Sequence, residues 1–165
     1  MNLEKQIFIA IWTLLLTGGV VYLIKALAFL KRKKEKEYNV SESIYLTSVI
    51  ISAATILKSS LLLIFQSYDI TNKISHEKLY YEIIKTSSAI SITGIVMLVL
   101  AVLIARFISS IFYPKRNELL EFDNNNIPYA IIRSAVLIIV VLLFSLSFDG
   151  LMGYFVPNDI PFFRG

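Results

Sequence analysis

Residues 127–148 read IPYAIIRSAVLIIVVLLFSLSF, a run of 22 residues in which Arg133 is the only charged side chain. About 20 apolar residues in a helix are enough to cross the hydrocarbon core of a bilayer. Lipid offers no hydrogen-bond partner to the backbone, so a spanning segment satisfies its own amides by forming a helix. This stretch therefore predicts a transmembrane helix.

Three more apolar stretches of this kind precede it, at Ile7–Leu30, Ile44–Gln66 and Ala89–Tyr113. Hydrophobic residues make up 56% of the 165-residue chain, above the roughly 45–50% of soluble domains, and a soluble chain this short could not bury so much apolar surface. We therefore expect an all-α integral membrane protein with four transmembrane helices in two tandem hairpins. The predicted parts are a first hairpin at 1–66, an outer connection at 67–85, a second hairpin at 86–149 and an aromatic interfacial tail at 150–165.

The distribution of cations predicts the orientation of the chain. Ten cations lie on the side of the first and third connections, and six lie on the other side. Cytoplasmic loops carry an excess of Lys and Arg, so connections 31–43 and 114–126 are expected in the cytoplasm. Both termini are then periplasmic, in a multi-pass protein of the bacterial inner membrane. The cluster expected to contact anionic lipid headgroups consists of Lys31, Arg32, Lys33 and Lys34.

Each even-numbered span is preceded by an asparagine, Asn39 in the first half and Asn126 in the second. Asparagine is a favoured N-cap, because its side-chain oxygen accepts a hydrogen bond from an amide of the first turn. Glu42 stands three residues after Asn39, the spacing of a capping box. The pattern predicts helix starts, and its alternative is a repeated polar lining at the cytoplasmic mouth.

Two tandem two-helix units with an Asn-rich step before each even helix resemble the small bacterial YjfL-like inner-membrane proteins. The stretch from Gly94 through Asn124-Asn125-Asn126 into the fourth span is the most similar. The resemblance implies a four-helix architecture in the cell envelope and implies no reaction.

Small and weakly polar residues recur at helical spacing in the second and third spans. Such stripes let two helix backbones approach closely in a membrane, so the favoured interpretation is a helix-packing face, and the alternative is the lining of a hydrated pore. The residues are Ser48, Ser52, Thr55, Ser59, Ser91, Gly94, Ala101 and Ala105.

Four cations lie within the spans, namely Lys25, Lys58, Arg106 and Arg133, whereas no acid lies deep in any span. Three of them are near the predicted cytoplasmic ends, where long side chains can snorkel to the headgroups. For Lys58, both snorkelling and burial in the bundle remain open. If the cations are buried, the lack of acids within the spans implies that their counter-charge comes from an anionic lipid, a transported anion or an acidic residue of a partner subunit. The acids of the third connection, Glu118, Glu121 and Asp123, are expected to form a solvated face.

Residues that commonly act in catalysis or bind metal ions are scarce in this chain. The chain has no cysteine and one histidine, His76, so no metal site, cofactor or catalytic group is expected, and the basic run indicates topology and not nucleic-acid binding. The sequence predicts a non-enzymatic membrane subunit that forms a homo-oligomer or anchors other subunits of an envelope complex. The alternative is a small oligomeric channel or transporter, with an anion as its candidate substrate.

Overall fold

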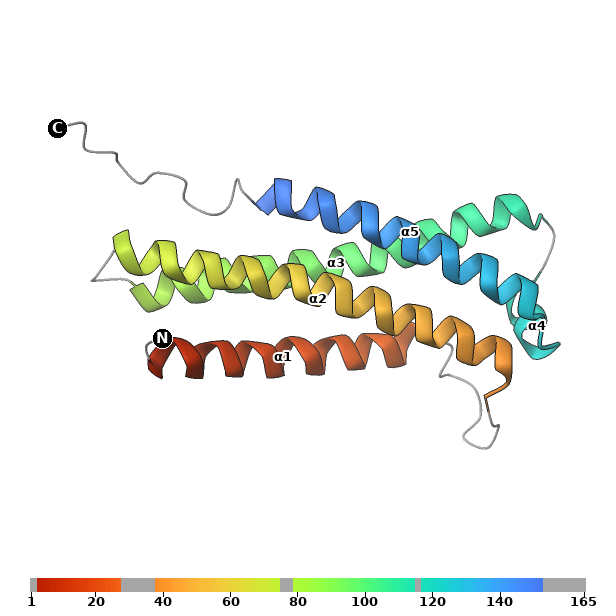
Figure 1. Cartoon of the computed structure of the whole chain (residues 1–165), viewed down its shortest axis with the longest axis horizontal. Helices are drawn as coiled ribbons and strands as arrows, with labels where there is room; N and C mark the ends of the chain where they lie inside the picture. The colour runs from red at the N-terminus through yellow and green to blue at the C-terminus, as the bar shows by residue number, and fades with distance from the viewer. Residues whose placement is uncertain (1–2, 28–37, 75–78, 115–116, 153–165) are drawn as a thin grey trace.

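The computed structural model describes residues 3–27, 38–74, 79–114 and 117–152 (Figure 1). This part of the chain is helical and contains no strand. The helices are α1 (Leu3–Leu27), α2 (Val40–Ile74), α3 (Leu79–Phe112), α4 (Glu118–Asp123) and α5 (Ile127–Met152). Four of them, α1, α2, α3 and α5, are long and apolar enough to cross a membrane, so the chain is a multi-pass helical membrane protein.

The four long helices lie roughly side by side and alternate in direction (Figure 1). Helices α1 and α3 run one way, and α2 and α5 run the other way, so the chain forms two hairpins of the same orientation. Helix α2 packs against α1, α3 and α5. In its most apolar stretch 44% of residues are buried, compared with 11% in α1. The core is therefore built from α2, α3 and α5, and α1 lies at its periphery.

The helices extend beyond the apolar stretches that predict them. Helix α2 continues eight residues past Gln66, and α3 begins ten residues before Ala89. The predicted outer connection at 67–85 is thus mostly helical, because residues 67–74 belong to α2 and residues 79–85 form the first turns of α3. Ser67, Tyr68 and Ile83 are buried here, so packing within the bundle stabilises helical turns that hydropathy alone does not indicate.

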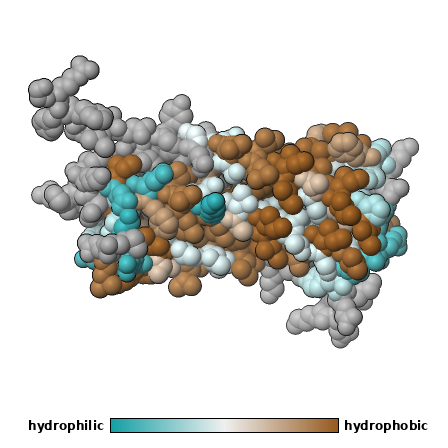
Figure 2. All heavy atoms as spheres, in the orientation of Figure 1, coloured by the Kyte–Doolittle hydropathy of each residue, from teal (hydrophilic) through white to brown (hydrophobic). Residues whose placement is uncertain are grey.

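Two apolar clusters fill the bundle. The larger one lies toward the end where α2 and α5 begin, and it includes Tyr45, Phe122 and Leu137. The smaller one lies toward the other end and joins Leu16, Ile64, Ile90 and Phe148 from the four long helices. Figure 2 shows hydrophobic side chains gathered between two more hydrophilic ends, as expected for a bundle that is solvated by lipid around its middle.

Candidate functional site

The first turn of α2 is capped by Asn39. Its side-chain Oδ1 accepts a hydrogen bond from the amide of Glu42 at 2.9 Å, and the Glu42 carboxylate accepts one from the Asn39 amide at 3.2 Å. This reciprocal pair is a capping box, which satisfies two amides that an uncapped helix leaves unpaired. The cap thus defines where α2 begins.

Asn126 has the same role in α5, where its Oδ1 accepts a hydrogen bond from the amide of Tyr129 at 3.1 Å. The preceding residue, Asn125, has a φ of 53°, a left-handed conformation that asparagine tolerates well. The amides of Asn125 and Asn126 donate to the carbonyls of Phe122 and Glu121. These bonds form a Schellman motif that ends α4 one residue before α5 is capped.

The two capped ends are in direct contact. The Asn39 side-chain amide and the Ser41 hydroxyl both donate to the Phe122 carbonyl, and the Ser41 amide donates to Asn125 Oδ1 at 2.9 Å. The asparagines of the two halves therefore do more than start their own helices. They join the first hairpin to the second through one shared set of hydrogen bonds.

Removing this junction should destabilise the bundle measurably. We expect Asn39→Ala to lower the free energy of unfolding by about 1–2 kcal/mol, because the cap and the bond to Phe122 are both lost. The measurement is unfolding of the purified protein in mixed micelles of increasing SDS content, followed by circular dichroism. Ser43→Ala is the control, because its hydroxyl is exposed and bonds only to Asn39 of its own helix among the described residues. Equal shifts for the two variants would contradict a joining role for Asn39.

Arg133 lies on α5 one turn after Tyr129, close to the contact between the two capped helix ends, and is 3% exposed. Its Nη2 is 2.6 Å from Glu118 Oε1 in an ion pair, and its Nη1 donates to the Tyr129 hydroxyl at 3.2 Å. The guanidinium carbon is 5.1 Å from the centre of the Tyr45 ring, within cation–π range. Helices α2, α4 and α5 thus enclose one buried cation.

Arg106 of α3 reaches the other oxygen of the same carboxylate, with its Nε donating to Glu118 Oε2 at 2.7 Å. Glu118 therefore bridges two guanidinium groups from different spanning helices. The expectation that Glu118 is solvated is wrong, because its side chain is only 12% exposed. The interpretation that Arg133 snorkels to the headgroups is wrong, because this residue is buried, and its counter-charge comes from the short helix α4 and not from outside the chain. Arg106 is exposed, so the expectation for a buried cation does not apply to it.

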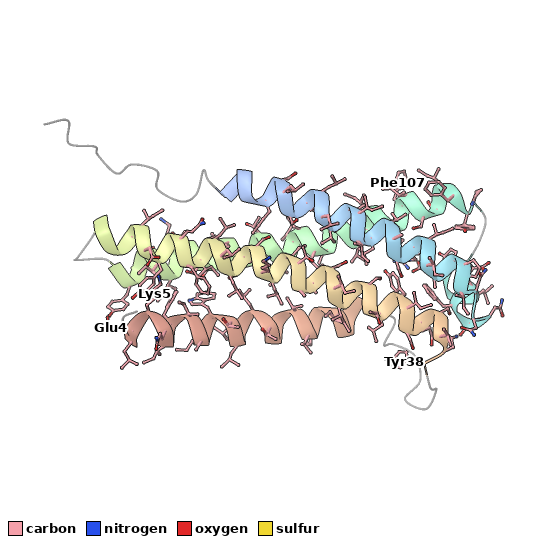
Figure 3. The ribbon with its side chains drawn as sticks, in the orientation of Figure 1. Glu4, Lys5, Tyr38 and Phe107 are labelled. Carbon is pink, nitrogen blue, oxygen red and sulfur yellow. The ribbon has the colours of Figure 1, made fainter. Side chains whose placement is uncertain are left out.

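The polar layer at the opposite end is formed by α1 and α2. Lys5 makes an ion pair with Asp69 and lies 5.9 Å from the centre of the Tyr68 ring. Figure 3 shows Lys5 between α1 and the last turns of α2. Phe8 also packs on Tyr68, with ring centres 5.4 Å apart. This layer anchors the beginning of α1, which has few other contacts.

Most residues of the predicted helix-packing face are buried in the bundle, and Gly94 lies at a contact between α3 and α2. A side chain added at Gly94 would meet Ser60 Oγ at 2.5 Å, so the two helices approach closely there. Thr55 and Ser59 are partly exposed, and Ser60, which the pattern did not select, is buried instead. The selected residues that are buried are Ser48, Ser52, Ser91, Gly94, Ala101 and Ala105.

Lys58 lies on the outward surface of α2 and is exposed. No ion pair or hydrogen bond joins its amine to the described residues, so burial within the bundle is not observed. Lys25 belongs to α1, but its side chain is outside the described part, as are the basic run at 31–34 and His76. Among the described residues, no three His, Cys, Asp or Glu side chains are grouped as metal ligands.

The comparisons with known proteins add no relative. No protein-family model matches the chain, and no curated protein or solved structure is similar to it. The resemblance of the Asn-capped repeat to the YjfL-like proteins stays a prediction, and the function is inferred from the geometry of the bundle.

Proposed function

We propose that this protein is a non-enzymatic, multi-pass subunit of the bacterial inner membrane that packs laterally against another membrane protein. The observation that carries the proposal is the outward face of α2. This face lies on the most buried helix of the bundle, yet it presents small and polar residues through the apolar region. They are Ser43, Thr47, Ala54, Lys58 and Gln66, interspersed with Ile50, Ile51 and Leu62.

The outward faces of the other core helices differ from it. At similar depth, α3 exposes Ile92, Val96 and Leu100, and α5 exposes Ile139 and Leu142. Large aliphatic side chains suit contact with lipid tails, whereas small and polar residues are enriched where transmembrane helices pack together. The contrast distinguishes one helix face that favours a protein neighbour from two that favour lipid.

The hydroxyls on this face do not carry the argument, because Ser43 and Thr47 donate to carbonyls of their own helix and are compatible with lipid. Lys58 is not. A cation at the centre of a transmembrane helix costs about 2.5–3.5 kcal/mol on insertion scales, and the described part of the chain offers Lys58 no compensating partner. A neighbouring protein would remove this cost.

The proposed orientation places Glu118, with its partners Arg106 and Arg133, at the cytoplasmic end of the bundle. The excess of cations in the first and third connections supports it, because α2 and α5, the helices that follow these connections in the chain, both begin at that end of the bundle (Figure 1). Both termini are then periplasmic.

Photo-crosslinking in the native membrane tests the proposal. A photoreactive amino acid at Ala54 should yield a discrete crosslinked protein species, because this residue lies at the centre of the outward face of α2. The matched control is the same amino acid at Ile139 of α5, which is exposed among aliphatic neighbours and should crosslink to lipid. If a neighbouring protein binds only the outward face of α2, position 54 gives a protein crosslink and position 139 gives lipid adducts. Lipid adducts alone at both positions would refute lateral packing.

A further inference from the structure

We infer that Lys58 forms an ion pair with a carboxylate carried at mid-membrane depth by a transmembrane helix of a different protein. The inference rests on the proposed lateral packing and specifies what the neighbour presents. It follows from the depth of Lys58, from the distance to the lipid headgroups, and from the positions of the acids in this chain.

The depth of Lys58 can be measured against the two polar layers of the bundle. Asp69, paired with Lys5, lies eleven residues later on α2, which is about 16 Å along a helix. Tyr45, whose ring lies under the Arg133 guanidinium, lies thirteen residues earlier, about 20 Å away. Since the hydrocarbon core of a bilayer is roughly 30 Å thick, Lys58 lies close to its middle.

At this depth the amine is too far from the headgroups to reach them easily. An extended lysine side chain spans roughly 6 Å from Cα to Nζ, given bonds of about 1.5 Å, and so covers less than half the distance to either polar layer. Snorkelling is effective for cations near the helix ends, where Arg106 is found. Anionic lipid therefore does not provide the counter-charge of Lys58.

The acids of the four long helices are equally out of reach of the Lys58 amine. Every Asp or Glu in the four long helices lies near a helix end, at Glu4, Glu42, Asp69, Glu82 and Asp149. A second copy of the chain has its acids at the same positions near the ends of its helices. These acids stay far from the middle of the bilayer whether the copy is inserted in the same or in the opposite orientation. Two copies that met through this face would bring two ammonium groups together. The carboxylate must therefore come from a different protein.

The surface next to Lys58 is suited to contact with a transmembrane helix of the neighbouring protein. Ala54 lies one turn before it on the same outward face, and a small residue at this position allows another helix to approach closely. A carboxylate at mid-span on such a helix has the same burial cost as Lys58, so pairing relieves both charges at once. The structure therefore favours a helix with Asp or Glu near its centre over a soluble anion.

Carbodiimide coupling in the native membrane tests the pair directly. The lipid-soluble reagent dicyclohexylcarbodiimide activates a carboxylic acid in the hydrocarbon region, and an adjacent amine displaces dicyclohexylurea to form an amide. The wild-type protein should yield one heterologous conjugate, and mass spectrometry should locate the amide between Lys58 and an Asp or Glu within a transmembrane segment of the other protein. Lys58→Arg should keep the partner on purification but give no conjugate, because guanidinium does not form the amide.

Lys58→Gln should give no conjugate and should reduce the recovered partner by at least about tenfold, because the carboxylate is left without its counter-charge. Absence of a conjugate from the wild-type membrane, a conjugate between two copies of this chain, or full recovery of the partner with Lys58→Gln would each overturn the inference. The proposed function is tested separately, because crosslinks from Ala54 would still show a protein neighbour on this face.

Discussion

Glu118→Gln should destabilise the folded bundle by about 3–5 kcal/mol, the cost of removing one partner of a buried ion pair. The substitution keeps the size of the side chain but removes the one carboxylate that pairs with Arg133 among the described residues, and Arg133 is 3% exposed. The amide that replaces the carboxylate is neutral and offers one acceptor oxygen where Glu118 offered two, to Arg106 Nε and Arg133 Nη2. The buried guanidinium of Arg133 would then keep its charge beside neutral groups, among them the Tyr129 hydroxyl and the Tyr45 ring. The measurement is unfolding in mixed micelles of increasing SDS content, followed by circular dichroism.

Two further variants separate this effect from a general loss of negative charge. Glu82→Gln removes an exposed acid whose pair with Lys85, at 3.8 Å, is solvated, and it should cost less than about 1 kcal/mol. Adding Arg133→Met to Glu118→Gln should recover most of the loss, because an apolar side chain of similar length leaves no charge to compensate. A result in which Glu118→Gln is as stable as Glu82→Gln would show that Arg133 finds its counter-charge elsewhere.

Gly94→Leu should be the second strongly destabilising change, with a loss of about 1–3 kcal/mol or more. A Cβ at this position would lie 2.5 Å from Ser60 Oγ and 3.5 Å from Ile56 Cγ2, and the larger side chain needs space that α2 occupies. The helices would have to separate where Gly94 meets Ser60 and Ile56 of α2. The same unfolding measurement applies.

Gly18→Leu is the matched control for this prediction. Gly18 is also within a transmembrane helix, but a Cβ there meets nothing within 4 Å, and the residue is exposed. Its replacement should leave the stability unchanged or raise it slightly, because leucine has the higher helix propensity. If the two substitutions have equal effects, the close approach of α2 and α3 at Gly94 is not important for stability.

The fold could be predicted from the sequence because the bilayer acts on each spanning segment separately. Runs such as 127–148 are long enough to cross the membrane by themselves, so hydropathy locates the four helices without knowledge of their neighbours. The ends of α2 and α3 could not be located in this way. The turns around Tyr68 and Ile83 bury these side chains in the bundle, and composition does not record such tertiary packing.

The candidate site was predictable only where its signals are local. Asn39 with Glu42, and Asn126 with Tyr129, interact within one helical turn, and the spacing of the sequence shows this. The contact between Ser41 and Asn125 joins residues 84 positions apart, and Arg106 meets Glu118 across the end of α3. Because an acid in a hydrophilic connection is usually solvated, nothing in the sequence distinguished Glu118 from Glu121 or Asp123.

The junction at Asn39 also sets an order of events during synthesis. The groups that complete the first turn of α2, the Phe122 carbonyl and Asn125 Oδ1, belong to a part of the chain made some 80 residues later. At 5–20 residues per second, they follow after about 4–16 s. During that interval, the first hairpin can occupy the membrane with the amide of Ser41 still bound to water. The junction at the start of α2 can therefore close only after the second hairpin has been made.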